Sequence, residues 1–448
     1  MKKTKFKMTG NGSRIEEVSE SSCLCASVLK KDAGTVEGGF NTETQRRRGT
    51  EFKMTEIGLI PEDWEVKRLG EMFELSAAGD LQFECSSREK TDLNIYPIYS
   101  NSIENAGMYG FTSNPRYSAD SITITGRGTL GHAEYRAVDF DAIIRLIIMK
   151  PLRMVDGRYV TFQINYCSPF HFEITSIPQL TVPQVANSLI PVPPLAEQKK
   201  IAEALSDVDE LLAAMTTLIE KKRAIKQGAM QELLTGKKRL PGFGGKWIGK
   251  RLGDCALIKA RIGWQGLTTD EYLENGPYYL ITGSDFRDGK VNWSQCYYVD
   301  KNRYEQDKNI QIQKNDVLVS KDGTIGKVAF LDEIPAEGTL NSGVFVIRTR
   351  DKEIEQLYMA WVFLSKWFDD FINRLVAGST IVHLYQKDIV GFEFPVPPTI
   401  AEQKAIAEVL SDMDAEISEL EAQKAKFESI KQGMMQELLT GKTRLKGA

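Results

Sequence analysis

The chain has 448 residues, a formal net charge of −4, 42% hydrophobic residues and 26% charged residues. These proportions are those of an ordinary globular protein of two or three domains. No apolar run approaches the ~20 residues of a membrane span, and the first residues lack a signal-peptide core, so we expect a cytoplasmic protein. The acidic balance argues against a nucleic-acid binder. A local basic groove would nevertheless suffice, because phosphate contacts act within a Debye length of ~10 Å.

Residues 1–53 differ from the rest of the chain. They are polar, show no periodicity and end near the run Arg46-Arg47-Arg48, which predicts a disordered leader. A DNA-contacting arm is the alternative, but a solvated tail is the commoner meaning of such a charge run. Met54 is then closer to the functional start of the protein.

A first globular segment is predicted over residues 54–190, with Trp64 near its start. Short runs at Ser121–Thr125 and Ala142–Met149, separated by Gly, Asn and Asp turns, predict strands of a mixed α/β domain. The sequence Thr-Gly-Arg-Gly-Thr-Leu-Gly-His-Ala follows at residues 125–133. Its glycines let backbone N–H groups approach a phosphate, and its basic side chains add charge. Many hairpin turns look similar, and the sequence is not a P-loop.

Residues 191–240 predict a long helical spacer that opens on Pro193-Pro194, since proline fits only a first helical turn. Gly236 stands where a left-handed C-terminal cap belongs. The 39 residues from Ala196 to Leu234 correspond to a rod of roughly 58 Å. Apolar residues recur at alternating steps of four and three, the spacing of a coiled-coil seam. They are Ile201, Leu205, Val208, Leu212, Met215 and Ile219.

The whole pattern then repeats, which fixes the architecture before any single motif does. A second globular segment is predicted over residues 241–394, and a second helical spacer over residues 395–448. Residues 395–445 correspond to residues 191–240, at an offset of 205 after one inserted residue near Ile400. Strands are predicted at Asp316–Ser320 and Val344–Arg348. Between them, residues 320–328 form a second glycine-rich turn, Ser-Lys-Asp-Gly-Thr-Ile-Gly-Lys-Val. Recurrence of this turn in two otherwise divergent segments strengthens it as a phosphate-contacting motif.

The two helices are expected to pair with each other. The second seam carries Ile406, Leu410, Met413, Ile417 and Leu420. Ile219 corresponds to Lys424 and Lys222 to Phe427, which suits pairing between the copies better than self-pairing; packing of each helix on a globular core is the alternative. The predicted fold class is α+β. Two mixed α/β domains are separated by two long helices that pair as an antiparallel coiled coil, in a pseudo-two-fold internal repeat.

Gly228 and Gly433 recur in register inside the two helices, where each costs ~1 kcal/mol relative to alanine. They indicate either a close backbone approach, by the partner helix or another subunit, or drift after duplication.

Candidate DNA-contacting residues are polar and aromatic side chains in predicted loops. Arginine reads guanine, and asparagine or glutamine reads adenine, through paired hydrogen bonds. For each residue taken singly, a solvated surface position is the commoner explanation. The candidates are Tyr99, Ser100, Asn101, Arg116, Tyr117, Arg127, Thr129, His132, Gln179, Arg261, Trp264, Gln265, Arg287, Lys321, Thr324, Lys327, His383, Tyr385 and Gln386.

Catalytic signatures are missing from the sequence. The three histidines have no spacing that would hold a metal, and neither a Walker sequence nor a Gly-x-Ser-x-Gly elbow is present. Asn114-Pro115 continues as Arg116-Tyr117, which is not the Asn-Pro-Pro-aromatic motif of adenine methyltransferases. The sequence predicts a non-catalytic binding protein.

Two similar helices open on Pro-[Pro/Thr]-x-Ala-Glu-Gln, end on Gln-Glu-Leu-Leu-Thr-Gly and alternate with divergent globular segments. This arrangement resembles the specificity subunit of type I restriction-modification enzymes. Glu197-Gln198 and Glu402-Gln403 carry the match, with tails at 231–236 and 436–441. The resemblance covers residues 55–448 and implies two target-recognition domains, each reading one half of a bipartite asymmetric DNA site. The helices would set the spacer and recruit two methyltransferase subunits, which ATP-dependent restriction subunits then join. S-adenosylmethionine, ATP and Mg²⁺ are expected on those partners and no cofactor on this chain.

Two alternatives remain open. A self-sufficient nuclease or methyltransferase is disfavoured by the missing motifs. A coiled-coil assembly scaffold without sequence-specific DNA binding is disfavoured by the recurring basic turns.

Overall fold

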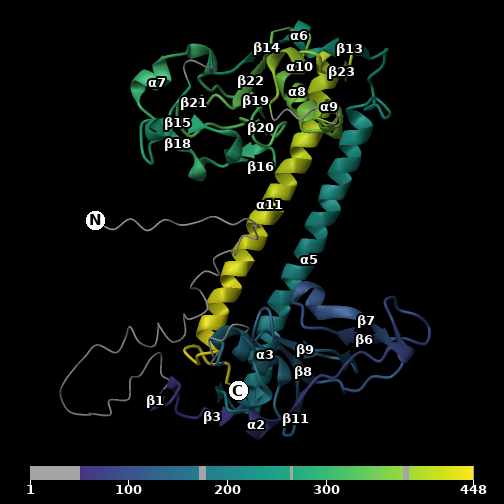
Figure 1. The fold of residues 1–448 in the computed structure, drawn as a ribbon, viewed down its shortest axis with the longest axis vertical. Helices are drawn as coiled ribbons and strands as arrows, with labels where there is room; N and C mark the ends of the chain where they lie inside the picture. The colour runs from purple at the N-terminus through teal and green to yellow at the C-terminus, as the bar shows by residue number, and fades with distance from the viewer. Residues whose placement is uncertain (1–50, 171–177, 263–265, 351, 377–382, 447–448) are drawn as a thin grey trace, which may run out of the picture. The chain divides into compact units, whose positions relative to one another are not determined.

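The computed structural model describes residues 51–170, 178–262, 266–350, 352–376 and 383–446 (Figure 1). The chain divides into two compact units. Unit 1 comprises the chain up to Ala213 and from Ala425 onward, and unit 2 comprises Ala214–Lys424. Each unit therefore combines one globular domain with a stretch of both long helices. Among the described residues, no helix is both long enough and apolar enough to cross a membrane.

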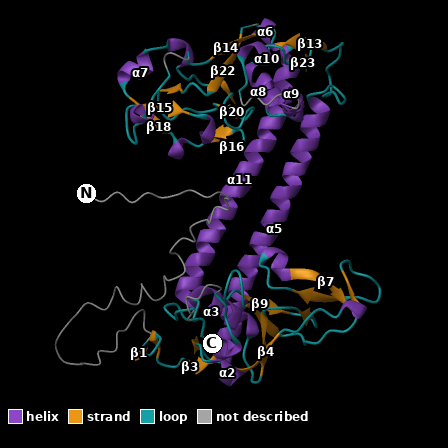
Figure 2. Cartoon of the chain, viewed as in Figure 1, coloured by secondary structure: helices purple, strands orange, loops and turns teal. Residues whose placement is uncertain are grey.

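The domain of unit 1 is built on an antiparallel sheet in the order β4-β11-β8-β9 (Figure 2). Its strands are β4 Phe73–Ala77, β8 Ser121–Thr125, β9 Ala133–Arg136 and β11 Leu146–Pro151. A second sheet, β10-β6-β7-β5, contains a parallel pair, β10 with β6. Its strands are β5 Ser86–Ser87, β6 Tyr96–Tyr99, β7 Met108–Thr112 and β10 Asp141–Ala142.

Two further strand pairs and three α-helices also belong to this domain. The pairs are β1 Phe52–Thr55 with β2 Gly58–Pro61, and β3 Glu65–Arg68 with β12 Leu189–Val192. The helices are α2 Leu69–Met72, α3 Gly157–Cys167 and α4 Val182–Ala186. Asp156 caps α3 by accepting hydrogen bonds from two backbone N–H groups. The core of this domain joins buried residues of the sheet to Ile201 and Leu438 from the long helices.

The domain of unit 2 contains an antiparallel sheet in the order β14-β22-β19-β20. Its strands are β14 Ala256–Lys259, β19 Val317–Ser320, β20 Val328–Phe330 and β22 Val344–Thr349. Further pairings are β18-β15-β21, β13-β23 and β16-β17. Their strands are β13 Ile248–Arg251, β15 Tyr278–Ile281, β16 Phe286–Arg287, β17 Lys290–Val291, β18 Tyr297–Val299, β21 Gly338–Leu340 and β23 Glu393–Val396. The helices are α6 Leu252–Cys255, α7 Lys301–Glu305, α8 Gln356–Phe363, α9 Lys366–Val376 and α10 Gln386–Ile389.

The two domains share one topology although their sequences diverge. The main sheet has the same order in both, with β4, β11, β8 and β9 matched by β14, β22, β19 and β20. The parallel pair of β6 and β10 is matched by β15 and β21. Even the tie between domain and spacer repeats. The hydroxyl of Tyr159 donates to the Pro191 carbonyl at 2.9 Å, and that of Tyr358 donates to the Pro395 carbonyl at 2.8 Å.

Most predicted strands are confirmed, with one error. Ser121–Thr125 is β8, and the runs at 316–320 and 344–348 are β19 and β22 within one residue. The single strand predicted at Ala142–Met149 is wrong. The chain breaks into β10 and β11 because Arg145 adopts a left-handed conformation with φ of 77°, which no strand residue can keep.

The long helices are α5 Leu195–Leu233 and α11 Ile400–Leu438, each of 39 residues. α5 therefore begins one residue before the predicted Ala196. Figure 1 shows the two helices side by side. In unit 2, Lys222 pairs with Glu416 at 2.6 Å and Lys226 with Asp414 at 2.5 Å, so one helix descends in number as the other rises. In unit 1, Lys431 pairs with Asp209 at 2.5 Å. The antiparallel coiled coil is confirmed, and the polar seam residue Lys222 has its partner on the other helix.

The helix ends follow the predicted chemistry. Gly236 and Gly441 have φ of 70° and 68°, the left-handed cap that glycine adopts without strain. A Cβ on Gly441 would lie 2.3 Å from Pro61. Substitution at this position therefore meets both strain and the packing of unit 1.

The glycines inside the helices behave differently. A Cβ added to Gly228 or Gly433 meets no heavy atom within 4 Å among the described residues. The partner helix therefore does not approach either glycine closely. Another subunit and drift after duplication remain as explanations.

The predicted leader, residues 1–53, falls mostly outside the described residues. Its last three residues do not, and of these Phe52 and Lys53 belong to β1 and pair with Pro61 and Ile60.

Candidate nucleic-acid interface

The glycine-rich turn of unit 1 joins β8 to β9 and is braced from inside by Thr125. The Thr125 hydroxyl donates to the Thr129 carbonyl and accepts from the His132 N–H at 2.9 Å. The backbone N–H of Gly131 donates to the Thr125 carbonyl at 2.9 Å. Gly128 and Gly131 have φ of 72° and 78°, which explains why glycine recurs here.

The glycine-rich turn of unit 2 joins β19 to β20 and is built in the same way around Ser320. The Ser320 hydroxyl donates to the Thr324 carbonyl at 2.5 Å and accepts from the Lys327 N–H at 2.9 Å. Gly326 donates its N–H to the Ser320 carbonyl at 2.9 Å. Thr129 and Thr324 are exposed at equivalent places. The sequence predicted two related turns, and the structure makes them matching hydrogen-bonded loops.

Asn101 supports the first turn from the neighbouring sheet. Its side-chain oxygen accepts from the Gly126 N–H at 2.8 Å, and its amide donates to the Arg127 carbonyl. Ser100 donates to the Gly107 carbonyl at 3.2 Å. Asn101 therefore holds the backbone that carries Arg127, whereas Ser100 closes its own loop. The Arg127 guanidinium donates to Gln179 Oε1 at 3.0 Å.

Three other candidates of unit 1 belong to a packed polar cluster. Arg116 donates from Nε to Asp141 at 2.6 Å, and this hydrogen bond raises the pKa of the guanidinium. Tyr117 stacks on Phe140 with ring centroids 5.5 Å apart. Tyr99 is buried beneath the Arg136 guanidinium, 3.5 Å from its ring centroid. A DNA contact by any of these three competes with contacts inside the domain.

His132 lies beside the first turn and bonds Glu134 at 2.9 Å. Burial alone would raise the pKa of Glu134, but the bond with His132 and the charge of Arg136 leave it below its ordinary value. The carboxylate therefore stays ionised next to the turn. Sequence inspection did not single out Glu134.

In unit 2 the candidates divide into buried and exposed groups. Arg261 is 2% exposed and donates to the Leu340 carbonyl, Gln306 and Thr339, so a DNA contact requires those bonds to break. Trp264 and Gln265 lie outside the described residues. Arg287, His383, Tyr385 and Gln386 are exposed, and Lys321 and Lys327 are half-buried on the turn.

His383, near the end of the second globular segment in sequence, contacts the second turn. Its Nδ1 lies 2.6 Å from Asp322 Oδ1. Asp322 was missed by sequence reasoning, because an acidic residue is an unlikely partner for phosphate. Only the contact with His383, 61 residues away, identifies it.

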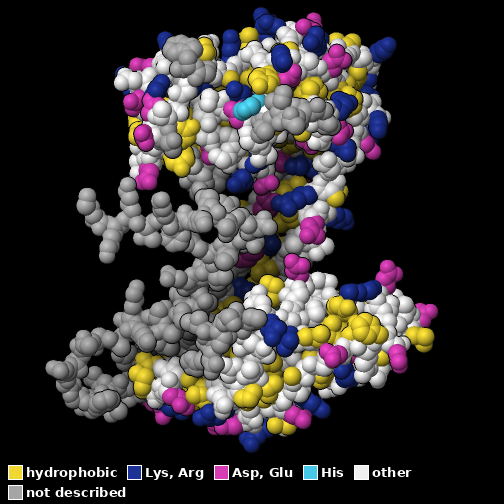
Figure 3. Space-filling view, viewed as in Figure 1, with side chains coloured by type: hydrophobic (Ala, Val, Ile, Leu, Met, Phe, Trp, Pro, Cys, Tyr) yellow, Lys and Arg dark blue, Asp and Glu magenta, His cyan; other side chains and the backbone are white. Residues whose placement is uncertain are grey.

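Charges of both signs lie at the two turns, as on the rest of the surface. Figure 3 shows basic and acidic side chains interspersed over the visible face of each unit. Each turn carries two basic side chains, Lys321 and Lys327 on one and Arg127 and His132 on the other, with an acidic neighbour, Asp322 or Glu134. In the described part of the chain, no group of three or more His, Cys, Asp or Glu side chains is arranged to hold a metal ion.

The Glu-Gln motif at each helix start has a structural role. Glu197 accepts from the Trp64 indole at 3.2 Å and from Arg444 at 2.7 Å, and Glu402 accepts from Arg239 at 2.7 Å. Gln198 accepts from the Asp156 N–H at 3.0 Å. The motif thus ties each helix to its own domain and to the arginine that follows the other helix.

Acid is expected to weaken unit 1 between about pH 4 and pH 2. Hydrogen bonds from Arg444 lower the pKa of Asp63 from its ordinary 3.8 to about 2, with burial opposing. The Asp63 carboxylate therefore binds a proton less tightly in the folded chain than in the unfolded chain. The contribution of the Asp63–Arg444 interaction to stability is complete above the pKa of Asp63 in the unfolded chain. It is lost as pH falls through the pKa of Asp63 in the folded chain. The free energies of unfolding of the wild type and of Asp63→Asn, compared across this pH range, measure that contribution. The variant should lose part of the pH dependence, and identical profiles contradict the assignment.

Comparison with known proteins places these features in a family. A model of the type I restriction modification DNA specificity domain matches residues 61–224 and again residues 246–428. The putative type I restriction enzyme MjaX specificity subunit of Methanocaldococcus jannaschii is 25% identical over 448 residues, covering 88% of this chain and 97% of that protein. The EcoKI specificity subunit of Escherichia coli is 28% identical over 163 residues, 36% of this chain and 34% of that one.

Solved structures agree at the level of the fold. The S subunit of a type I restriction-modification system from M. genitalium has a TM-score of 0.61 at 15% identity, covering 84% of this chain and 96% of that chain. The family model occurs once in each repeat and spans most of both domains and helices. The chain therefore belongs to the family of type I restriction modification DNA specificity domain proteins.

Proposed function

We propose that this chain is the DNA-binding specificity subunit of a type I restriction-modification complex. Each recognition domain reads one half of a bipartite, asymmetric site in double-stranded DNA. The observation that carries the proposal is the pair of turns braced in the same way, each exposing different side chains. They lie in domains joined to long helices whose two ends recur in sequence. Divergent readers on a constant scaffold are what a protein needs when specificity must vary and partner docking must not.

The chain itself performs no chemistry in this proposal. Two methyltransferase subunits bring S-adenosylmethionine, and restriction subunits bring ATP and Mg²⁺, all in the cytoplasm. The relatives named above are specificity subunits of type I restriction enzymes, which supports this division of labour. The missing catalytic motifs support it as well.

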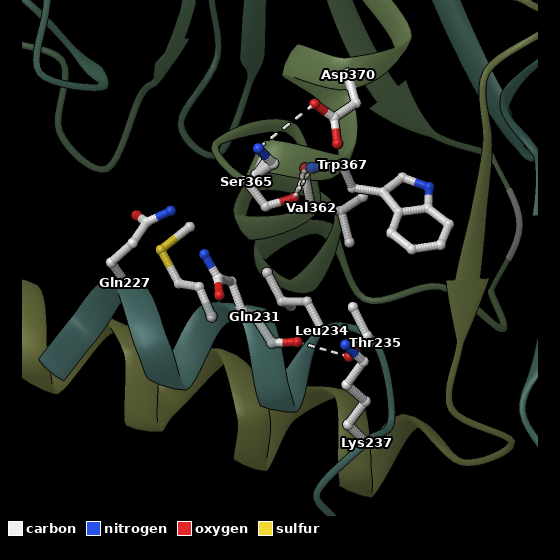
Figure 4. A pocket seen from close by; sticks show the side chains of 11 residues that line it. Gln227, Gln231, Leu234, Thr235, Lys237, Val362, Ser365, Trp367 and Asp370 are labelled. Carbon is white, nitrogen blue, oxygen red and sulfur yellow. Dashed lines mark hydrogen bonds and ion pairs between the residues drawn. The ribbon is translucent and has the colours of Figure 1, made fainter. Parts of the chain in front are cut away.

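The ends of the two long helices are the proposed docking surfaces for the methyltransferases. Gln227–Lys237 recurs as Gln432–Lys442 with one difference, Ala229 against Met434. A repeated surface suits two copies of one partner. In unit 2 this stretch lines a cavity of about 430 Å³ with residues of α8 and α9. Figure 4 shows Gln227 and Gln231 of α5 on one side of it, and Trp367 and Asp370 of α9 on the other.

The double variant Gly228→Ala with Gly433→Ala tests this surface. Alanine should stabilise each helix by ~1 kcal/mol, because nothing in the described chain meets the added Cβ. A methyltransferase backbone that approaches these glycines would be pushed away, with a cost of ~1–3 kcal/mol in docking. We therefore expect a higher melting temperature of the isolated chain and weaker methyltransferase binding by titration calorimetry.

The exposed Lys221 on α5 provides the control, since Lys221→Ala should leave docking unchanged. A stabilised glycine variant with undiminished docking would mean that the two glycines reflect drift after duplication.

The proposed function is tested by co-expressing the chain with a cognate methyltransferase and mapping methylated adenines across a host genome. One bipartite motif with a fixed gap is the expected result. A stable complex that leaves no motif would instead favour a coiled-coil assembly scaffold.

A further inference from the structure

The two glycine-rich turns are equivalent position by position. Beyond the bonds of Thr125 and Ser320, the N–H of Leu180 donates to the Gly126 carbonyl at 3.0 Å, and that of Leu384 donates to the Lys321 carbonyl at 2.8 Å. A later chain segment therefore crosses each turn at the same place. This correspondence matches Arg127 with Asp322 on the turns, and Gln179 with His383 on the crossing segments.

At these two positions the side chains meet in both units, but their chemistry differs. Arg127 Nη2 lies 3.0 Å from Gln179 Oε1, and His383 Nδ1 lies 2.6 Å from Asp322 Oδ1. Gln179 and His383 are exposed, and the Asp322 side chain is 35% exposed. Arg127 is half-buried, and its Nε is enclosed. Each pair thus reaches solvent through at least one exposed side chain, beside a turn braced by the same kind of hydroxyl.

A purely structural brace does not explain this combination. The hydroxyl and glycine bonds that shape the turns recur in both units, and Asn101 adds a further brace to the first. The exposed pair, in contrast, replaces a cation and an amide by a carboxylate and an imidazole. The turns also differ at Gly126 against Lys321 and at His132 against Lys327. A change of donors and acceptors at a facing pair, on a loop of matching shape, nevertheless supplies what sequence discrimination requires, because base edges differ in donors and acceptors.

We propose that residues 127 and 179 in unit 1, and residues 322 and 383 in unit 2, are equivalent base-reading pairs that each set one position of a half-site. This inference rests on the proposed function and identifies the reading site within each domain.

The chemistry of each pair indicates its base. An arginine held by a glutamine presents N–H groups to guanine O6 and N7, whereas a carboxylate accepts from the amino group of cytosine. Asp322 tolerates nearby DNA only where such a donor faces it, with Lys321 and Lys327 on the same turn offsetting its charge. Unit 1 should therefore require guanine, and unit 2 cytosine, at the position that the pair reads.

The test uses the full chain with its methyltransferase and the same genome-wide methylation map. Asp322→Asn preserves shape but replaces an acceptor oxygen by an amino donor. It should lower the preference for the wild-type base at one position of one half-site by about tenfold or more. The other half-site and the gap should not change. D322R/H383Q, which carries the pair of unit 1 into unit 2, should redirect that position toward guanine.

An ion pair elsewhere on unit 2 gives the matched control. Lys290 and Asp332 are 3.1 Å apart and about half exposed, and Asp332→Asn should leave the motif intact. A wild-type motif that persists in both Asp322 variants overturns the inference while the proposed function stands. Loss of all methylation in both, with Asp332→Asn active, also overturns it, because the pair is then a brace. Absence of any motif with the wild-type chain defeats the proposed function itself.

Discussion

Replacing Arg444 by methionine is expected to destabilise unit 1 by ~3–5 kcal/mol, the cost of leaving a buried carboxylate without its cation. The Arg444 and Glu197 side chains are 7% and 3% exposed, and Nη2 lies 2.7 Å from Glu197 Oε2. Arg444 also donates to both oxygens of Asp63 at 2.7 and 2.8 Å. After the substitution, Glu197 keeps the Trp64 indole and one backbone N–H as donors, which do not neutralise its charge.

Denaturant unfolding of the full chain, with hydrogen exchange followed at residues 61–69 and 195–205, measures the effect and locates it in unit 1. Lys446→Met is the matched control, since Lys446 lies 3.3 Å from the same Asp63 but is 60% exposed. An exposed pair contributes ~0–1 kcal/mol. If Arg444→Met and Lys446→Met lower the free energy of unfolding equally, then Arg444 does not act by neutralising the buried charge of Glu197. Exchange in unit 2 should stay unchanged, because Arg239 and Glu402 form the corresponding pair there.

The regular parts of this fold were predictable because their signals are local or repeated. The alternation of four and three steps predicted α5 and α11 as paired helices, since the seam period depends only on residues within one helix. The positive φ at Gly236 and Gly441 follows from the same local chemistry. The repetition of the helix ends along the chain predicted the pseudo-two-fold architecture from the sequence alone.

The candidate site was predictable only in part, because its contacts join distant residues. The turns were visible as sequence motifs, but Asp322 gained meaning only through His383. Arg261, whose residue type suits guanine recognition, is instead buried and donates hydrogen bonds to Thr339 and to the Leu340 carbonyl. The Glu-Gln motif was recognised as a signature. Its role as a tie to Arg444, 247 residues from Glu197, could not be read from spacing.

Removing one facing heptad from both long helices, residues 216–222 of α5 and 418–424 of α11, is expected to change the gap of the recognised site and neither half-site. Seven residues shorten a helix by about 10 Å, close to three base pairs at 3.4 Å each. A heptad is nearly two whole turns, so the helix faces shift by only about 20°. The seam continues because Lys226 and Phe427 move into the vacated seam positions.

Methylation mapping of this paired deletion distinguishes a spacer from a passive linker. We expect the wild-type half-sites with a gap shorter by about three base pairs. Deleting residues 216–222 alone is the control. This deletion removes Lys222, the ion-pair partner of Glu416, and shortens α5 while α11 keeps its length. Methylation should therefore fall, and no new fixed gap should appear. An unchanged gap in the paired deletion would contradict the proposal that the helices set it, because the length of the coiled coil is the property that the deletion alters. A new gap with both half-sites preserved would separate base reading from spacing, assigning the first to the domains and the second to α5 and α11.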